Sequence, residues 1–540
     1  MPKQYGSPTL LMGITMAFFL LITATAPLYA ESGGGLTEDG LGTVVTPAGT
    51  TFDITGGTRP GGPTGSNLFH SFSQFNVENG ETANFIGDSS LTNIFVRVTG
   101  GNNSWIDGTI KTTNTNANVY IMNPNGVMFG SNASFDANGS VYVSTADYVK
   151  LADDNRFYAD VVKTSVLTTA APAAFGFLAT PGGNISVNGS HQLTVAVDKT
   201  LSLIGGDLLM DNGATLTAAS GQVNLVSVAS AGEVDISGTD PVMNGVTAQG
   251  DVTIRASSKI DVNGDGGGRV FIRGGNVVLE NASIEAKTTG ATAGLGVDIA
   301  ASNTLTFTHS LIDTATGGTG NAGNVILSAA DITLDGFGAS ADEVFIDTRT
   351  DGLANAGNIT LTATNSITLD ASGASAQIRI FADSLATPGL AGDLALNANS
   401  IIVQGQELFS LSSTATDAAS IGTIGATAST ITVDGQEGSL LVDKTGVGGF
   451  YVITNVILDG SLGPAQSVAG PAYTVQEAWG TVSGANLFHS AKKFIVDSGE
   501  SVIFEHVDSI DRIIIRVTGG DVTTIDGAIS ASNGADVCIV

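Results

Sequence analysis

The sequence is poor in basic residues, in aromatic residues and in cysteine. Lysine and arginine together number 20 against 50 aspartates and glutamates, which gives a formal net charge of -30 over 540 residues. A chain with so little positive charge has no surface that could neutralise the phosphates of a nucleic acid. We therefore expect no nucleic-acid partner, and we expect the negative charge to keep the chain soluble.

Cys538 is the single cysteine, so no disulfide can form within the chain. Aromatic residues make up 6 % of the sequence, whereas apolar residues reach 42 % and glycine numbers 71. The apolar content is therefore mainly Ala, Val, Ile and Leu, and Thr, Ser, Asn and Asp fill much of the remainder. This composition is typical of strands and turns rather than helices, and it predicts an all-β protein.

The N-terminus predicts a signal peptide over residues 1–30. Lys3 supplies a short positive region, an apolar run covers residues 10–24, and Ala30 ends a cleavage site. The alternative is an uncleaved anchor helix, although the run is short for a full membrane span.

The middle of the chain repeats itself with a period close to 34 residues. Two series show the period: Gly323, Gly357 and Gly392, and Ile312, Ile346 and Ile380. A fixed period in a strand-forming unit indicates a solenoid, in which Asn and Asp at repeated corners hydrogen-bond from coil to coil. We predict a right-handed parallel β-helix over residues 166–450; the alternative, an array of β-sandwiches, would need a longer period.

Several linked motifs precede the repeats. They are NLFHSFSQFNV at 67–77, RVTGG at 97–101, IDGTI at 106–110, VYIMNPNGVMFG at 119–130 and GSVYVSTAD at 139–147. In this order they resemble the N-terminal secretion domain of filamentous haemagglutinin-type exoproteins, the passengers of two-partner secretion. The resemblance implies a secretion domain at 31–165 that caps the β-helix.

The same resemblance implies the partners and the destination of the chain. The general secretion machinery would deliver it to the periplasm, and an outer-membrane transporter with periplasmic POTRA domains would export it. The chain would then be secreted or displayed on the cell surface of a Gram-negative bacterium. A host or surface receptor, of unknown identity, would be its further partner.

The motif Asn123, Pro124, Asn125 and Gly126 matches the residue preferences of a type I turn. Proline fixes the backbone at the second position and so reduces the freedom of the unfolded chain. The resemblance implies that this turn is read by the transporter and nucleates the fold. The alternative is that it is an ordinary turn.

A second copy of the N-terminal motifs lies near the C-terminus. The stretch ANLFHSAKKFIVDSGESVIF from Ala485 repeats SNLFHSFSQFNVENGETANF from Ser66, and an offset of 419 also relates Arg97 to Arg516. We expect a linker at 451–470 and a second, truncated copy of the secretion domain at 471–540. The sequence stops at Val540, where NPNG would follow, which is the expectation for a truncated or fused reading frame.

The sequence offers little catalytic or cofactor chemistry, and we expect no enzyme, no catalytic residues and no cofactor. Asp261, Asn263 and Asp265 match the first half of a calcium loop, but Ile272 stands where a bidentate glutamate is needed. These three residues are a weak candidate for a calcium site; the alternative is an ordinary turn rich in Asn, Asp and Gly. A G-x-G-x-x-G match at 318–323 precedes a predicted strand, whereas dinucleotide binding requires a helix there.

Three classes of function remain open. The first is an adhesin-like exoprotein with an adhesive or structural rod. The second is a β-helix enzyme acting on polysaccharide, which would need clustered Lys and Arg beside carboxylates. The third is the carrier part of a contact-dependent toxin, whose effector is not visible in the sequence.

The signal peptide gives the first testable prediction. We expect cleavage after Ala30, so that the exported chain begins at Glu31. N-terminal sequencing of protein recovered outside the cytoplasm measures this directly. An exported chain that still begins at Met1 would contradict the prediction.

Overall fold

The structure is a computed structural model. It describes residues 35–178, 182–189, 192–336, 343–372, 377–385, 387–404, 409–416, 420–433, 436–437, 441–442, 450–451, 456–468, 472–496, 500–507, 509–519 and 523–540. The predicted signal peptide lies outside these residues. Within them, strands dominate, short 3-10 turns occur at η1 (Gly62–Thr64) and η4 (Glu477–Trp479), and no helix is long and apolar enough to cross a membrane.

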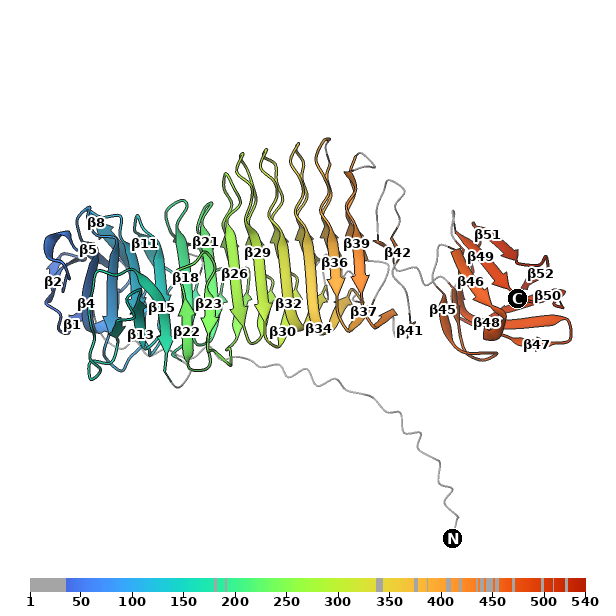
Figure 1. Cartoon of the computed structure of the whole chain (residues 1–540), viewed down its shortest axis with the longest axis horizontal. Coiled ribbons are helices and arrows are strands. Elements are labelled where there is room, and N and C mark those ends of the chain that lie inside the picture. The colour runs from blue at the N-terminus through green and yellow to red at the C-terminus, as the bar shows by residue number, and fades with distance from the viewer. Residues whose placement is uncertain are drawn as a thin grey trace, which may run out of the picture. The chain divides into compact units, whose positions relative to one another are not determined.

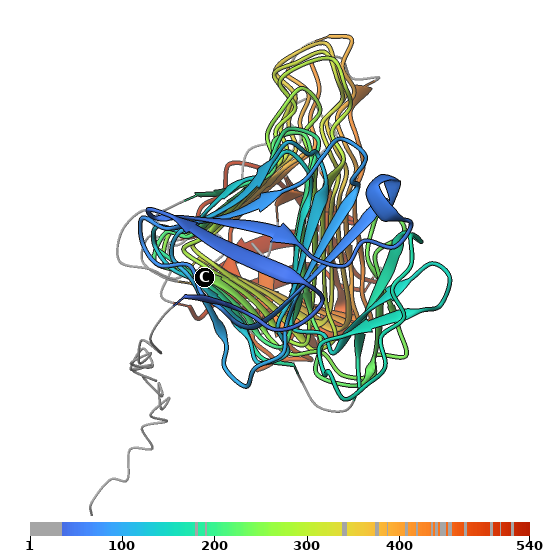
Figure 2. The same cartoon turned by 90° about the vertical axis from the view of Figure 1, so that its left-hand side faces the viewer.

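Parallel strands stacked coil upon coil form a β-helix (Figure 1), and the view along the stack shows successive coils following one path (Figure 2). Each coil contributes up to three strands, one to each of three rows. The strands of the first row are β4 (Asn67–Phe75), β6 (Asn93–Val98), β9 (Asn118–Met122), β12 (Val141–Ser144), β18 (Thr200–Gly205), β21 (Gln222–Ser227), β26 (Arg269–Gly274), β29 (Gly296–Ala301), the first parts of β32 (Val325–Asp335) and β34 (Ile359–Asp370), β36 (Leu394–Asn397) and β39 (Ile424–Thr427).

The other two rows are built in the same way. The second comprises β7 (Ser104–Ile106), β10 (Val127–Phe129), β16 (Ile185–Asn188), β19 (Leu208–Asp211), β24 (Val252–Arg255), β27 (Val277–Glu280), β30 (Thr304–Thr308), the last parts of β32 and β34, β37 (Ser400–Gln404) and β40 (Thr430–Val433). The third comprises β3 (Thr51–Gly56), β5 (Thr82–Ile86), β8 (Thr109–Thr113) and β11 (Ser134–Asp136), then β17 (Gln192–Thr194), β20 (Thr215–Thr217), β25 (Lys259–Asp261), β28 (Ser283–Glu285), β31 (Leu311–Asp313), β33 (Glu343–Asp347), β35 (Gln377–Phe381) and β38 (Phe409–Ser412).

The predicted all-β parallel β-helix is confirmed, and so is the register implied by the repeats. Ile312 pairs with Ile346 and Ile346 with Ile380, so the periodic isoleucines stack directly on one another. Alternate residues of each strand point inward, as the period of two requires. One continuous apolar cluster of such inward residues runs through the coils from Ile54 to Ile424.

Asparagine and glycine shape the corners of the coils. Oδ1 of Asn321 accepts the N–H of Asn355 at 3.1 Å, and Oδ1 of Asn355 accepts the N–H of Leu390 at 3.0 Å. A Cβ atom on Gly357 would lie 2.1 Å from the carbonyl oxygen of Gly323 in the preceding coil, so only glycine fits there. The hydrogen bonds between successive coils thus continue through the corners, where one strand row ends and the next begins.

The N-terminal end of the β-helix is capped. β1 (Leu36–Glu38) pairs antiparallel with β4, and β2 (Thr43–Ala48) pairs antiparallel with β3. These strands cover edges that would otherwise present unpaired backbone groups. The coils already begin at β3, and one sheet runs through both sides of the boundary expected at residue 165. That domain boundary stays a prediction.

A separate antiparallel sheet, the cover sheet, packs on the outside of the first row. It consists of β14 (Arg156–Tyr158), β13 (Tyr148–Leu151), β15 (Pro172–Phe177), β22 (Gly232–Asp235) and β23 (Val242–Asn244), in that order. A second apolar cluster lies between the cover sheet and outward residues of the first row, among them Phe69, Phe95 and Tyr120. The early coils are therefore apolar on both faces, which explains runs such as NIFVRV.

The C-terminal segment repeats the strand pairing of the first coils. Its strands are β44 (Val456–Leu458), β45 (Gln466–Val468), β46 (Ala472–Gln476), β47 (Thr481–Ser483), β48 (Asn486–Phe494), β49 (Ser501–Glu505), β50 (Arg512–Val517), β51 (Ala528–Ala531) and β52 (Asp536–Ile539). Leu487 pairs with Ile513 in β48 and β50 as Leu68 pairs with Ile94 in β4 and β6. β44 and β45 lie in the stretch expected to be a linker; β44 pairs antiparallel with β48, as β1 does with β4.

The stacked core gives the second prediction. Ile367 of β34 is fully buried, whereas its neighbour Thr368 points outward. Truncating Ile367 to alanine should lower local stability by about 2–5 kcal/mol, because a cavity is left in a core that cannot collapse. Native-state hydrogen exchange of β32, β34 and β37 measures the loss, with Thr368→Ala as the control. Equal effects of the two substitutions would contradict the inward register.

Candidate functional site

The motif Asn123, Pro124, Asn125 and Gly126 forms the corner between β9 and β10. The N–H of Gly126 donates to the carbonyl oxygen of Asn123 at 3.1 Å, and the N–H of Asn125 donates to the side-chain Oδ1 of Asn123 at 3.0 Å. Gly126 has a φ of 122°, a backbone conformation that favours glycine. Asn123 is fully buried and Asn125 is exposed, so one asparagine holds the turn from inside and the other faces outward.

The corner is bonded to the coils on both sides. The Asn123 amide donates to Oγ of Ser104 at 3.0 Å, and the Asn125 amide donates to the carbonyl oxygen of Gly100 at 2.7 Å. On the other side, the N–H of Gly183 donates to the carbonyl oxygen of Pro124 at 2.7 Å.

β9 and β10 do not pair with each other. β9 pairs with β6 and β12, and β10 pairs with β7 and β16. The hydrogen bonds of the turn therefore reach the neighbouring coils, and its two flanking strands are not paired with each other, which the motif alone did not disclose. Its role in transporter recognition and in nucleating the fold stays a prediction.

An aromatic ladder on the outer face of the first row was missed by the sequence reasoning. Phe69 stacks on Phe95 with ring centroids 4.7 Å apart, Phe95 on Tyr120 at 5.0 Å, and Tyr120 on Tyr142 at 4.6 Å. Burial raises the pKa of Tyr120. The repeat of an aromatic residue at the same strand position in successive coils is the signal that could have revealed the ladder.

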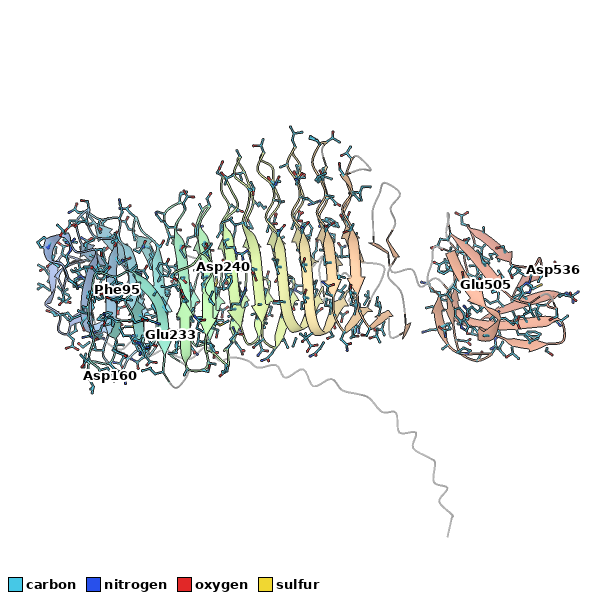
Figure 3. All side chains as sticks on the ribbon, in the orientation of Figure 1. Phe95, Asp160, Glu233, Asp240, Glu505 and Asp536 are labelled. Atoms are coloured by element: carbon cyan, nitrogen blue, oxygen red, sulfur yellow. The ribbon has the colours of Figure 1, made fainter. Side chains whose placement is uncertain are left out.

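The cover sheet and the loop between its strands β14 and β15 are also bound to these coils by polar contacts. The Asn67 amide donates to the carbonyl oxygens of Thr168 at 2.9 Å and Ala170 at 2.7 Å, and Arg97 donates to the carbonyl oxygen of Tyr158 at 2.8 Å. Figure 3 labels Phe95 in the ladder and, on the cover sheet, Glu233. Glu233 accepts hydrogen bonds from Tyr148 and Lys150 within the sheet.

Four polar residues, here named the cap latch, fasten the N-terminal cap to the first two coils. They are Asp39, Ser71, Arg97 and Thr99. The N–H of Asp39 donates to the Ser71 carbonyl at 2.9 Å, the Thr99 hydroxyl donates to the Asp39 carboxylate at 2.6 Å, and Arg97 Nε donates to Ser71 Oγ at 2.9 Å.

The C-terminal segment contains the same latch, built from Asp459, Ser490, Arg516 and Thr518. The N–H of Asp459 donates to the Ser490 carbonyl at 2.9 Å, Thr518 donates to the Asp459 carboxylate at 2.7 Å, and Arg516 Nε donates to Ser490 Oγ at 3.1 Å. The Asp459 carboxylate accepts hydrogen bonds from the hydroxyls of Thr518 and, at 2.7 Å, Ser490, and these bonds hold the pKa of Asp459 well below its usual range.

A buried histidine accompanies each latch. His70 is fully buried between β4 and the cap, with Nδ1 3.3 Å from Oγ1 of Thr43 and its ring 5.5 Å from that of Phe85. His489 lies at the equivalent position, 5.6 Å from Phe504. Burial lowers the pKa of His70 to about 4 and also lowers the pKa of His489.

The calcium candidates engage protein donors. Asp261 pairs with Lys259 at 2.9 Å, the Asn263 amide donates to Glu285 at 2.9 Å, and Asp265 accepts the N–H of Ala291 at 3.1 Å. In the described part of the chain no three His, Cys, Asp or Glu side chains gather as metal ligands. The calcium site stays a prediction that the geometry does not favour.

Comparison with known proteins identifies the family. The family model of the TPS secretion domain matches residues 34–270 and 454–540, together more than half of the chain. The crystal structure of the HMW1 secretion domain from Haemophilus influenzae is similar, with a TM-score of 0.47 and 15 % sequence identity over 74 % of this chain and 97 % of that one. The search of curated proteins found no match.

The chain belongs to the TPS secretion domain family. The resemblance to two-partner secretion passengers is thereby confirmed. The family indicates export across the outer membrane by a two-partner system, with a cognate outer-membrane transporter as the partner. It points to a secreted passenger rather than to an enzyme.

The buried histidine gives the third prediction. Because the pKa of His70 is lower in the folded chain than its usual value of 6.5, the unfolded chain binds the extra proton between pH 6.5 and pH 4. Stability should fall in that window by about 1.4 kcal/mol per pH unit as the pH decreases. Chemical denaturation of the wild type and of His70→Gln at several pH values measures the difference. Identical pH profiles would contradict the assignment.

Proposed function

We propose that the chain is an adhesin-like exoprotein whose N-terminal coils are the export signal and whose later coils are an adhesive or structural rod. The general secretion machinery delivers it to the periplasm after removal of the signal peptide. A transporter with periplasmic POTRA domains then binds the N-terminal coils and moves the chain across the outer membrane. Outside, the rod meets a host or surface receptor.

The single observation that carries this proposal is the corner at Asn123, Pro124, Asn125 and Gly126. It is bonded to the preceding coil through Gly100 and to the following coil through Gly183. A chain that emerges unfolded needs a local structure that forms early and fixes the register for the next coil. A turn closed by its own asparagine side chain meets that need, and the exposed Asn125 offers the transporter a polar contact.

The rod supports the adhesive role through its regularity. From β24 to β40 the coils stack on one another in parallel register. The outward positions of β30, β32 and β34 carry mainly Thr, Ser, Asp and Asn, and Thr306, Thr333 and Thr368 are aligned in one column. Such a surface offers repeated hydrogen-bonding groups at the coil spacing of about 4.8 Å. No catalytic role is proposed for it.

The corner gives the fourth prediction. Replacing Asn123, Pro124, Asn125 and Gly126 by alanine removes the Asx bond, the fixed proline and the left-handed glycine. Secretion with the transporter co-expressed should fall at least tenfold, and the chain should be degraded in the periplasm. Quantitative immunoblotting of culture supernatant and periplasm measures both.

A matched control is the tetra-alanine replacement at 350–353, a corner of the rod. Secretion of the 123–126 variant at the wild-type rate would show that the motif is an ordinary turn. Secretion of the wild type without any transporter would contradict the proposed function itself.

A further inference from the structure

The basic residues of the rod gather on one of its three faces. Between residues 274 and 443 the chain contains three lysines and arginines: Lys287, Arg349 and Arg379. All three lie in strands of the third row or within two residues of them. The third row is therefore the face of these coils on which positive charge accompanies the carboxylates.

Two phenylalanines stand beside these arginines and point outward. Phe345 of β33 and Phe381 of β35 are half-buried, whereas Ile346, next to Phe345, points inward and is fully buried. The two strands pair with Phe345 opposite Arg379 and Asp347 opposite Phe381. The two rings, from successive coils, touch with their centroids 5.6 Å apart and their planes at 80°.

Two rings and two guanidiniums thus form one surface, here named the aromatic–arginine platform: Phe345, Arg349, Arg379 and Phe381. The guanidinium carbon of Arg379 lies 4.8 Å from the ring centroid of Phe345 and 5.6 Å from that of Phe381. The guanidinium carbon of Arg349 lies 5.5 Å and 5.1 Å from the same two centroids. These are cation–π distances, so the four side chains hold one another in place.

The platform keeps hydrogen-bond donors that the protein does not use. Nε of Arg379 donates to Glu343, and Nε and Nη2 of Arg349 donate to Asp347. No described residue accepts a hydrogen bond from the two terminal nitrogens of Arg379 or from Nη1 of Arg349. The side chains of Arg349 and Arg379 are 32 % and 39 % exposed, so a ligand can reach these N–H groups.

The coils do not need such a platform in order to stack. β32 and β34 carry mainly Thr, Ser, Asp and Asn at their outward positions, and they pair in register all the same. A group of partly exposed aromatic residues in a chain with few aromatics is therefore a feature that stacking leaves unexplained. Planar rings beside a few directed polar groups are typical of a binding site.

A sugar residue matches the groups that the platform offers. Its C–H bonds form an apolar face that packs on an aromatic ring, and its hydroxyls accept hydrogen bonds from N–H groups. Phe345 and Phe381 belong to successive coils, which are about 4.8 Å apart. This spacing is close to the length of one sugar residue in an extended polysaccharide, so two consecutive sugars can each meet one ring.

The charges around the platform favour an uncharged sugar. Glu343, Asp347 and Asp383 supply three carboxylates beside the two guanidiniums of Arg349 and Arg379. An acidic polysaccharide would meet this local excess of negative charge in a chain whose net charge is -30. Sugar hydroxyls need no counter-charge, and they can also donate to the carboxylate of Glu343.

We propose that the aromatic–arginine platform is a binding site for uncharged sugar residues of a surface polysaccharide. The rings stack on two consecutive sugars, and the free terminal nitrogens of Arg349 and Arg379 donate to their hydroxyls. The inference rests on the proposed function, since it takes the rod as the adhesive part and names the class of ligand that the rod meets. No bond of the sugar is made or broken.

Affinity electrophoresis of the full-length chain tests the proposal. Native gels contain a soluble glucan, mannan or galactan, or the acidic polymer polygalacturonate. At least one neutral polysaccharide should retard the wild type in proportion to its concentration, and polygalacturonate should not. Phe345→Leu/Phe381→Leu should raise the Kd about tenfold or more, because leucine keeps apolar volume but offers no ring plane.

The chain offers matched controls in the same coils. Phe345→Tyr/Phe381→Tyr keeps both ring planes and should retain binding. Thr333→Ala/Thr368→Ala changes outward residues of the second row and should leave the Kd unchanged. Hydrogen exchange of β33 and β35 shows whether the leucine variant still folds there. Arg379→Gln, which leaves both rings in place, should weaken binding as well and does not depend on that result.

A wild type that none of the neutral polysaccharides retards would overturn the inference. Retardation by polygalacturonate alone would do the same, and so would equal binding by the wild type and the leucine variant. Loss of binding in Thr333→Ala/Thr368→Ala, with the leucine variant unaffected, would also refute the platform as the site.

Secretion separates this inference from the proposed function. With the transporter co-expressed, the leucine variant should be secreted as well as the wild type. A chain that needs the transporter but binds no neutral polysaccharide would refute the sugar site alone. A wild type that is secreted without the transporter would contradict the proposed function, whatever its binding to polysaccharide.

Discussion

The hydrogen-bonded register between successive coils is the constraint on which the rest of the structure depends. Each strand of the rod from β24 to β37 pairs in parallel with the strand at the same position in the next coil, as Ile312, Ile346 and Ile380 show. Because side chains alternate with a period of two, a slip of one residue would turn each inward isoleucine out to solvent. The asparagine hydrogen bonds at the corners stabilise that register, and the glycines allow the close contact between coils that it requires.

Register has to begin at some coil, and we propose that it begins in the N-terminal coils. β1 and β2 occupy edges that would otherwise pair with other chains, and the cap latch fastens them to the first two coils. The corner at residues 123–126 then bonds forward and backward, and the aromatic ladder under the cover sheet adds a second apolar core to coils that already have one. The most heavily braced coils are thus the first ones. This arrangement suits a chain that emerges unfolded from a transporter, because the N-terminal coils then provide the surface on which each later coil stacks.

Much of the fold could be predicted because the sequence repeats with a period close to 34 residues. The spacing of Gly357 and Gly323 gave the coil length, and the structure shows that their backbones approach too closely for any side chain. The turn at Pro124 was also predictable, since its residue preferences are local.

The cover sheet could not be predicted from the sequence. Strands of the early coils are apolar on both faces, so a continuous run such as NIFVRV does not show which residues face the interior of the coil and which face a second sheet. In the sequence, Phe95 resembles any other core residue. Only the pairing of β4, β6 and β9 shows that it stacks on Phe69 and Tyr120 on the outer face of the coils. The partners of β9 and β10 were equally hidden, since contacts between coils connect positions about 20 to 60 residues apart.

The central claim is that folding starts at the braced N-terminal coils and proceeds along the stack. Pulsed hydrogen exchange during refolding of the full-length chain tests it most directly, with protection read strand by strand. The account predicts that amides of β4, β6 and β9 become protected before those of β34, β36 and β37. Protection that appears first in β34 to β37, or in all strands at once, would contradict it.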